Sequence, residues 1–392
     1  MDSVEAAIRN NHPAIKMLEA EAKSMDEEAK GAYSWMPPEL GAGFFQTPYN
    51  PRNWKSMDGQ PGMGMFMISA QQMFPNRKSQ EADFAYMQAK SSVARQRKEV
   101  VLNELLYTAR ANYYDWIVLE KKLKILNDNY NLLHFMIQSA EIRYKNGLGK
   151  IGAYYKAKAA IAGIDNQKLK LENEIAQKRI AINTAMNRNP LDSIVIDTSI
   201  SWMQFDPALF DSASLRKQRS DISVLEQSIK VNQLERESEL TKLKPQFGIK
   251  YDHMTQLGNR PFMFSLMGMV RIPLTKWSSR MNKAKAESLL WQSEVLRSQQ
   301  EMILNEATGM SASALTELVA LKRQLGLYQD QIIPALQKNF KTMELGYEQN
   351  TEELFELFDA WEALNNMQME SLDQLQKALS MQAALMKLAE IK

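Results

Sequence analysis

The chain has 392 residues, of which 45% are hydrophobic and 24% charged, with a formal net charge of +2. This composition excludes a wholly disordered chain and gives no support for bulk attraction to nucleic acid. Without cysteine there is no disulfide, thiolate metal site or cysteine nucleophile.

Hydropathy and the start of the sequence bear on whether the protein crosses a membrane or carries an export signal. No window approaches about 18 uninterrupted apolar residues, so a membrane role would have to use strands. Residues 1–5 show no basic stretch leading into an apolar one. We therefore expect either that the protein is not exported or that a signal was removed before the numbering begins.

The first half of the chain predicts a helix, two strands, a long helix, a reversal and a second helix. Apolar spacings of three, four and seven predict a helix over 1–36, which Pro37 and Pro38 end. Extended runs over 39–49 and 62–74 predict two strands. Residues 76–146 contain no glycine or proline, and one helix of that length would reach roughly 105 Å. Gly147 and Gly149 suit a reversal into a helix over 151–187.

The second half repeats this order after a connector over 188–213. Residues 12–19 return as 219–226, and Pro38 and Gly41 return at the same offset as Pro245 and Gly248. Strands are predicted over 246–256 and 262–272, followed by a long helical region over 276–345 that Pro334 could kink. A last helix is predicted over 351–391. The domains are then two repeats, 1–187 and 214–392, joined by the connector.

The strands have the length and alternation of membrane strands. Each is about 11 residues long, which suits a tilted crossing of a hydrocarbon layer. In the last strand Phe262, Phe264 and Leu266 share one face, whereas Ser265 and Arg271 lie on the other. A soluble sandwich can show the same alternation. Four strands cannot close a barrel, so closure in a membrane would need several copies.

Sequence motifs at the reversals make the chain similar to the outer-membrane efflux protein family, the TolC-like exit ducts. Residues 347–360, YEQNTEELFELFDA, resemble the tip signature of the family, Gly147-Leu148-Gly149 its first tip, and Asn11-His12-Pro13 its opening. Asn350 stands where the family usually has glycine, Glu352 where some members have arginine, and Phe358 where leucine is usual. These departures concern gating more than the fold.

The resemblance implies an α+β membrane protein built as a trimer. A long α-helical barrel would continue into a transmembrane β-barrel of 12 strands, four from each chain, with an internal two-fold repeat. The chain would lie in a Gram-negative outer membrane with its helical part in the periplasm. It would be a passive exit duct for small molecules or ions, working with a periplasmic adaptor protein and an inner-membrane pump in a tripartite efflux or type I secretion system.

Two groups of site residues follow from the resemblance. Glu356 and Asp359 lie three apart on the last helix with Glu352 one turn earlier, and they would line the periplasmic aperture and favour cations. As charges on an exposed helix they would be unremarkable. The reversal residues would dock the adaptor or serve only as turns: Gly147, Leu148, Gly149, Asn350 and Thr351.

Methionine is abundant, with 25 residues, and several fall on predicted strand faces. A lumen lined with thioethers would suit Cu(I) or Ag(I) rather than drugs. Methionine more commonly fills irregular apolar space. The candidates for a lumen face are Met63, Met65, Met67, Met263, Met267 and Met269.

Alternatives to the duct are a structural coiled-coil protein of the cell envelope without a pore, and a helical adaptor. The adaptor is disfavoured because the lipoyl-like β segment expected between its helices is missing. The three histidines are far apart, and the sequence has no phosphate-binding loop, G-x-S-x-G element or dinucleotide fingerprint. We therefore expect no enzyme activity, no metal or cofactor site of the usual kinds, and no nucleic-acid partner.

Overall fold

The computed structural model describes the chain except for residues 56, 58, 60–61, 148–150, 258–261, 274 and 392, and except for the side chain of Ala153. The described chain divides into two compact units. One comprises residues 1–17, 98–222 and 302–392, and the other residues 18–97 and 223–301. We refer to them as the tip unit and the sheet unit.

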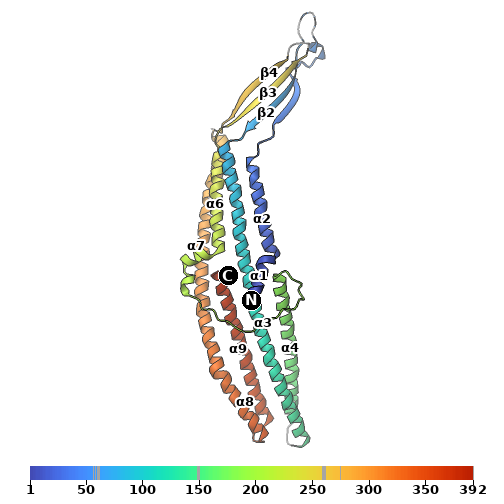
Figure 1. The fold of residues 1–392 in the computed structure, drawn as a ribbon, viewed down its shortest axis with the longest axis vertical. Coiled ribbons are helices and arrows are strands. Elements are labelled where there is room, and N and C mark those ends of the chain that lie inside the picture. The colour runs from blue at the N-terminus through green and yellow to red at the C-terminus, as the bar shows by residue number, and fades with distance from the viewer. Residues whose placement is uncertain are drawn as a thin grey trace. The chain divides into compact units, whose positions relative to one another are not determined.

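The sheet unit contains one antiparallel sheet of four strands, in the order β1-β2-β3-β4 (Figure 1). The predicted strands are all present, but three have shorter bounds. The strands are β1 (Glu39–Phe45), β2 (Met65–Phe74), β3 (Gln246–Gln256) and β4 (Met263–Arg271).

Local backbone geometry explains the shorter strands. β1 ends before Gln46, whose φ of 48° lies in the left-handed region. β2 begins only after Gly64, whose φ of 104° is one that residues with a side chain rarely adopt. The predicted extensions to residue 49 and back to residue 62 are therefore wrong. A short 3₁₀-helix, Pro51–Trp54, lies between β1 and β2.

The first helix is broken, contrary to the single helix predicted over 1–36. It is divided into α1 (Asp2–Asn11) and α2 (Pro13–Lys30), followed by a 3₁₀ turn over Gly31–Tyr33. His12 is extended, with φ −63° and ψ 127°, because the ring of a following proline disfavours the helical region. Arg219 is extended in the same way between α5 (Ser212–Gln218) and α6 (Ser220–Thr241).

The long helix is observed as predicted. α3 runs from Arg77 to Lys145, within one residue of both predicted ends. The side chain of Asn76 accepts a hydrogen bond from the backbone N–H of Lys78 at 3.0 Å, which satisfies one of the unpaired donors of the first turn. α4 (Ile151–Ala185) follows.

The second long helical region is interrupted and ends later than predicted. α7 (Lys276–Leu327) passes into a π-helical turn over Tyr328–Ile332 and then into α8 (Ile333–Glu348). Pro334 has no N–H to donate, and the chain widens to an i to i+5 bond from the Ile333 N–H to the Tyr328 C=O. α9 (Leu354–Leu388) begins three residues after the predicted start.

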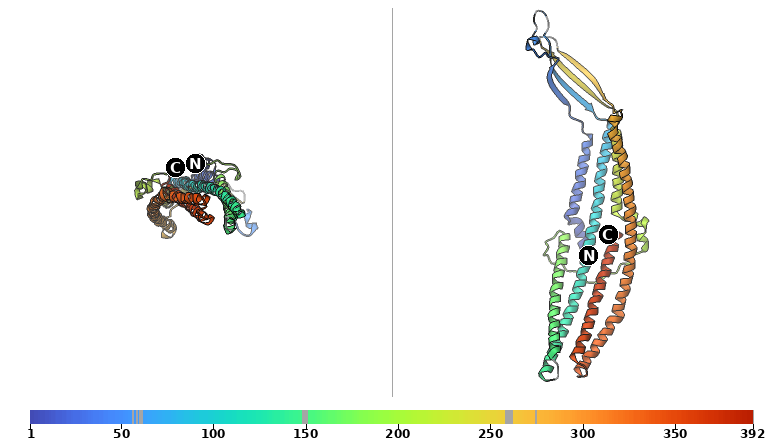
Figure 2. Two further views of the ribbon diagram at one scale, coloured as in Figure 1. Left: turned by 90° about the horizontal axis from the view of Figure 1, so that it is seen from below. Right: turned by 180° about the vertical axis from the view of Figure 1, so that it is seen from behind.

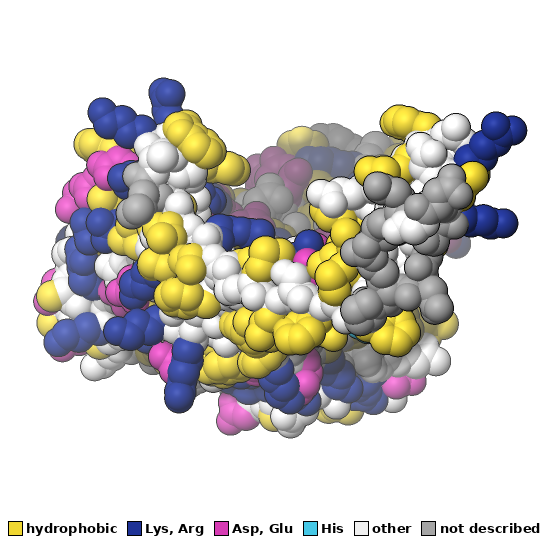
Figure 3. All heavy atoms as spheres, turned by 90° about the horizontal axis from the view of Figure 1, so that it is seen from above, with side chains coloured by type: hydrophobic (Ala, Val, Ile, Leu, Met, Phe, Trp, Pro, Cys, Tyr) yellow, Lys and Arg dark blue, Asp and Glu magenta, His cyan; other side chains and the backbone are white. Residues whose placement is uncertain are grey.

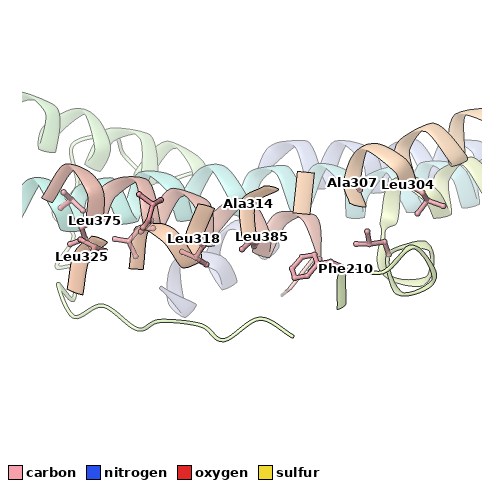
Figure 4. Packing of buried hydrophobic residues seen from close by; sticks show 14 of the residues in the cluster. Phe210, Leu304, Ala307, Ala314, Leu318, Leu325, Leu375 and Leu385 are labelled. Atoms are coloured by element: carbon pink, nitrogen blue, oxygen red, sulfur yellow. The ribbon is translucent and has the colours of Figure 1, made fainter. Parts of the chain in front are cut away.

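Three clusters of buried apolar side chains hold the tip unit together. One packs α7 and α9 with Phe210 of the connector and Leu215 of α5 (Figure 4). A second joins α3 and α4 to α8 and α9, and the third packs α1 against α3. The predicted connector contains the 3₁₀-helix Pro207–Phe210 within otherwise irregular chain. In Figures 1 and 2, α8 and α9 run antiparallel, as do α3 and α4.

Among the residues that the structure describes, none of the helices has both the length and the apolar character needed to cross a bilayer.

Candidate functional site

The turn between α8 and α9 is closed by a left-handed residue. Asn350 has a φ of 61°, and the N–H groups of Thr351 and Asn350 bond to the C=O groups of Gly346 and Tyr347. This is a Schellman motif, in which asparagine is the usual substitute for glycine. The departure of Asn350 from the family pattern therefore preserves the turn.

The side chain of Glu352 packs over Gly346. A Cβ on Gly346 would lie 2.5 Å from Cγ of Glu352, so only glycine permits this packing. The prediction that Glu352 lies one turn before Glu356 on the same helix is wrong, because α9 begins at Leu354. Glu352 instead belongs to the turn, from which its carboxyl group reaches Glu356.

The carboxyl groups of Glu356 and Glu352 lie within hydrogen-bonding distance of each other. A hydrogen bond that protonated Glu356 donates to the Glu352 carboxylate raises the pKa of Glu356 above its ordinary value of 4.5, and the negative charges of Glu352, Glu353 and Asp359 raise it further. Glu356 itself is exposed on the first turn of α9. Glu356 therefore keeps its proton to a higher pH than an isolated glutamate would.

Asp359 is neutralised by a lysine that the sequence analysis did not single out. Nζ of Lys156, on α4, lies 2.7 Å from Oδ1 of Asp359. The same ammonium group lies over the rings of Phe355 and Phe358, at 4.0 and 4.3 Å from their centroids. The exposed carboxylates of this tip are therefore less negative than the sequence suggested.

A second cationic contact, also absent from the sequence analysis, joins α3 to α8. The guanidinium of Arg143 lies 3.9 Å from the ring centroid of Tyr347 and donates to the Tyr347 carbonyl. Burial raises the pKa of the Tyr347 hydroxyl, and the nearby Arg143 charge partly offsets this. Beside them is a small cavity of about 50 Å³, lined by Phe135, Phe340 and Leu357 among others.

The other reversal, between α3 and α4, is described only in part. Gly147 has a φ of 73° and donates its N–H to the C=O of Tyr144, as expected for a helix C-cap. Leu148 and Gly149, the other two predicted docking residues here, lie outside the described residues.

One face of the sheet is apolar and open to the surroundings. Strand register places Phe66, Ile249 and Leu266 on this face, and their side chains are 38%, 48% and 67% exposed. Seen from above, the surface of the molecule carries hydrophobic side chains among charged ones (Figure 3). The exposed apolar members of this face are Leu40, Phe44, Phe66, Ile68, Phe247, Ile249, Tyr251, Phe264, Leu266 and Val270.

The opposite face carries the charged residues and the methionines. Lys250 and Asp252 form an ion pair at 3.1 Å on this face, and Asp252 is buried. Met65 and Met67 of β2 and Met263, Met267 and Met269 of β4 share it, as predicted from the alternation. The inclusion of Met63 on a strand face is wrong, because β2 begins at Met65.

Both edges of the sheet are open. Within the described chain, β1 pairs only with β2, and β4 pairs only with β3. The outer backbone N–H and C=O groups of β1 and β4 are thus available to further strands.

Comparison with known proteins connects these features to a family. Residues 6–188 match the pattern of the family described as outer membrane efflux protein. No curated protein sequence matches the chain.

Solved structures match almost the whole chain. The outer membrane protein VceC from Vibrio cholerae is 15% identical, with a TM-score of 0.76 over 99% of this chain and 95% of that one. The Campylobacter jejuni CmeC outer membrane channel is 11% identical, with a TM-score of 0.76 over 99% and 85%. The open state of the Neisseria gonorrhoeae MtrE outer membrane channel is 12% identical, with a TM-score of 0.76 over 99% and 88%. At these identities the likeness shows a common fold.

Proposed function

We propose that this chain, whose residues 6–188 belong to the outer membrane efflux protein family, forms a trimeric outer-membrane channel. The channel would be the passive exit duct of an energised tripartite efflux or type I secretion system. The observation that carries the proposal is a four-stranded sheet with one exposed apolar face and two open edges.

Such a sheet requires both lipid and further copies of itself. The apolar face would remain unfavourably exposed in water, whereas lipid would cover it. In lipid each unpaired backbone group costs several kcal/mol, so β1 of one copy must pair with β4 of the next. Three chains would supply 12 strands, and the face with Lys250 and Asp252 would line the lumen.

A stripe on α7 supports contact between copies. Trp277, Met281, Trp291 and Val295 recur at helical spacing, and each is at least 65% exposed in the single chain. Apolar side chains at such spacing are typical of helix-to-helix contacts. We assign this stripe to the contact between neighbouring helices of the trimer.

The placement and partners follow from the same assembly. The helices would extend into the periplasm of a Gram-negative cell. There a periplasmic adaptor would bind the reversal residues and couple the duct to an inner-membrane pump. The proposed docking residues are Gly147, Leu148, Gly149, Asn350 and Thr351. The helices of each half are interrupted by one extended residue at corresponding positions, His12 between α1 and α2 and Arg219 between α5 and α6, which supports the proposed internal repeat. No catalytic role is proposed.

Oligomeric state and conductance test the proposal together. Protein extracted from membranes in detergent should elute as a trimer and conduct ions in a planar bilayer. A monomer or dimer without conductance would instead favour the structural coiled-coil protein.

Ion selectivity should depend on Lys156. Replacing Lys156 with methionine keeps the aliphatic stem against Phe355 and frees the charge of Asp359, so cation selectivity should rise. Asp359→Asn should lower it, because this change also leaves Lys156 unpaired. Reversal potentials in a salt gradient measure both effects. Lys158→Met, an exposed lysine of the same helix, is the control and should change selectivity less.

Selectivity should also fall as the pH is lowered. Protonation removes the charge of Glu356, and its raised pKa places this loss above the ordinary value of 4.5. Glu352→Gln should move the midpoint to lower pH, since it removes the negative charge and the charged hydrogen-bond acceptor that raise the pKa of Glu356. An unchanged midpoint in Glu352→Gln would show that the carboxyl pair does not control the titration.

A further inference from the structure

The methionines of the sheet are distributed unequally between its two faces. All seven methionines within the four strands lie on the charged face, and none lies among the exposed Phe, Leu, Ile and Val side chains of the other. Methionine used only as apolar filler would also be expected on the apolar face. These seven residues are Met65, Met67, Met73, Met254, Met263, Met267 and Met269.

Strand register brings three of the seven into one row. Met67 of β2 lies opposite Met254 of β3, which lies opposite Met263 of β4. Residues directly opposite in an antiparallel sheet have Cβ atoms about 4.5–5.5 Å apart, and methionine has three rotatable bonds with which to adjust its sulfur. Three thioethers can therefore converge on one point above β3.

Two further thioether side chains meet nearby on the same face. The sulfur of Met73 and the terminal methyl of Met269 both contact the position that a Cβ on Gly248 would occupy. Gly248 lies between Met73 and Met269 in the strand register. Because glycine has no side chain, the two methionine side chains can approach each other above β3.

The surroundings offer thioethers rather than the oxygen ligands of a hard-metal site. Between the two methionine rows lies the buried carboxylate of Asp252, paired with Lys250. Among the described residues, no three or more His, Cys, Asp or Glu side chains come together in a way that could hold a metal ion. His253 lies on the apolar face, opposite Ile68 and Phe264. The remaining soft donors are thioethers, which select Cu(I) and Ag(I) over hard cations.

We propose that Met67, Met254 and Met263 form a binding site for a soft monovalent cation, Cu(I) or Ag(I). The pair Met73 and Met269 provides a second, weaker position along the same face. That the bound ion is also transported rests on the proposed channel function, whereas binding itself does not.

Silver binding to the detergent-solubilised protein tests the site. Equilibrium dialysis against Ag(I) nitrate in chloride-free buffer, with bound metal quantified, should show at least one tightly held ion per chain, retained in excess sodium. Met67→Leu with Met254→Leu keeps the apolar volume and should remove that ion. Met302→Leu with Met310→Leu, two exposed methionines of α7 outside the stripe assigned to the trimer contact, is the matched control and should bind as the unaltered chain does.

Methyl spectra of methionine-labelled protein give a second measurement on the unaltered chain. Ag(I) should shift the methyl resonances of Met67, Met254 and Met263 first, each identified by its loss in a single leucine variant. Equal silver binding in Met67→Leu with Met254→Leu, or early shifts confined to other methionines, would overturn the site. A trimer that conducts ions but binds no silver defeats only this inference. A protein that binds silver but never conducts defeats only the proposed channel.

Discussion

Replacing Leu266 with arginine is expected to prevent assembly in the membrane. Leu266 is 67% exposed on the apolar face, in the middle of β4 and opposite Tyr251. An arginine facing lipid near the middle of a bilayer costs about 2–4 kcal/mol in a membrane barrel, and a trimer incurs this cost in each chain. Trimer in the outer-membrane fraction, resolved by electrophoresis without heating, should be strongly reduced.

The neighbouring residue gives the control for this prediction. Ser265 lies on the opposite face of the same strand, beside Asp252 in the strand register. An arginine there would face the proposed lumen and an acidic partner, so Ser265→Arg should assemble normally. Equal assembly of both variants would show that lipid does not cover the face that carries Leu266.

Removing the charge of Glu5 is expected to destabilise the tip unit more than any surface substitution. Arg110, only 3% exposed, donates two hydrogen bonds to the Glu5 carboxylate, at 2.7 and 3.1 Å, and a third to the Ile391 carbonyl at 2.8 Å. Glu5→Gln would leave a buried guanidinium without a counter-charge, which typically costs about 3–5 kcal/mol. The measurement is the free energy of unfolding in urea, followed by loss of helical circular dichroism.

Two variants separate charge burial from general damage. Glu5→Gln combined with Arg110→Met removes both charges and should recover most of the lost stability. Asp373→Asn breaks the ion pair between Lys122 and Asp373, whose side chain is 54% exposed, and should cost less than about 1 kcal/mol. A loss in Asp373→Asn as large as in Glu5→Gln would show that burial of Arg110 is not the cause.

The sequence predicted the long elements well and the strand ends less well. α3 could be placed within one residue because no glycine or proline interrupts it and because Asn76 caps it. The strand next to Gly64 was predicted too long, since its left-handed φ cannot be read from an extended-looking run. The break at His12 could have been predicted from the proline that follows it.

Of the charged residues at the α8–α9 turn and its surroundings, the sequence indicates the acidic ones but not the lysine that pairs with one of them. Glu356 and Asp359 follow from the family motif, which is local in sequence. Lys156, which neutralises Asp359, lies about 200 residues earlier, and no local pattern shows which face of α4 packs against α9. Similarly, the methionine row depends on register between β2 and β3, which a single strand cannot specify.

The π-helical turn over Tyr328–Ile332 changes the phase of a heptad repeat. Buried residues of α7 recur at alternating steps of three and four up to Leu318, Leu321 and Leu325. The buried and partly buried apolar residues of α8 continue the same steps from Ile333, but each falls one residue later than an unbroken count would place it. They are Ile333, Leu336, Phe340, Met343 and Tyr347.

A π turn takes up one extra residue, so it absorbs this offset and keeps both stripes facing their partners. The region therefore behaves as two coiled-coil blocks joined by a single inserted residue. Deleting Gln329 should restore one continuous α-helical count, whereas substituting it should leave the phase change in place.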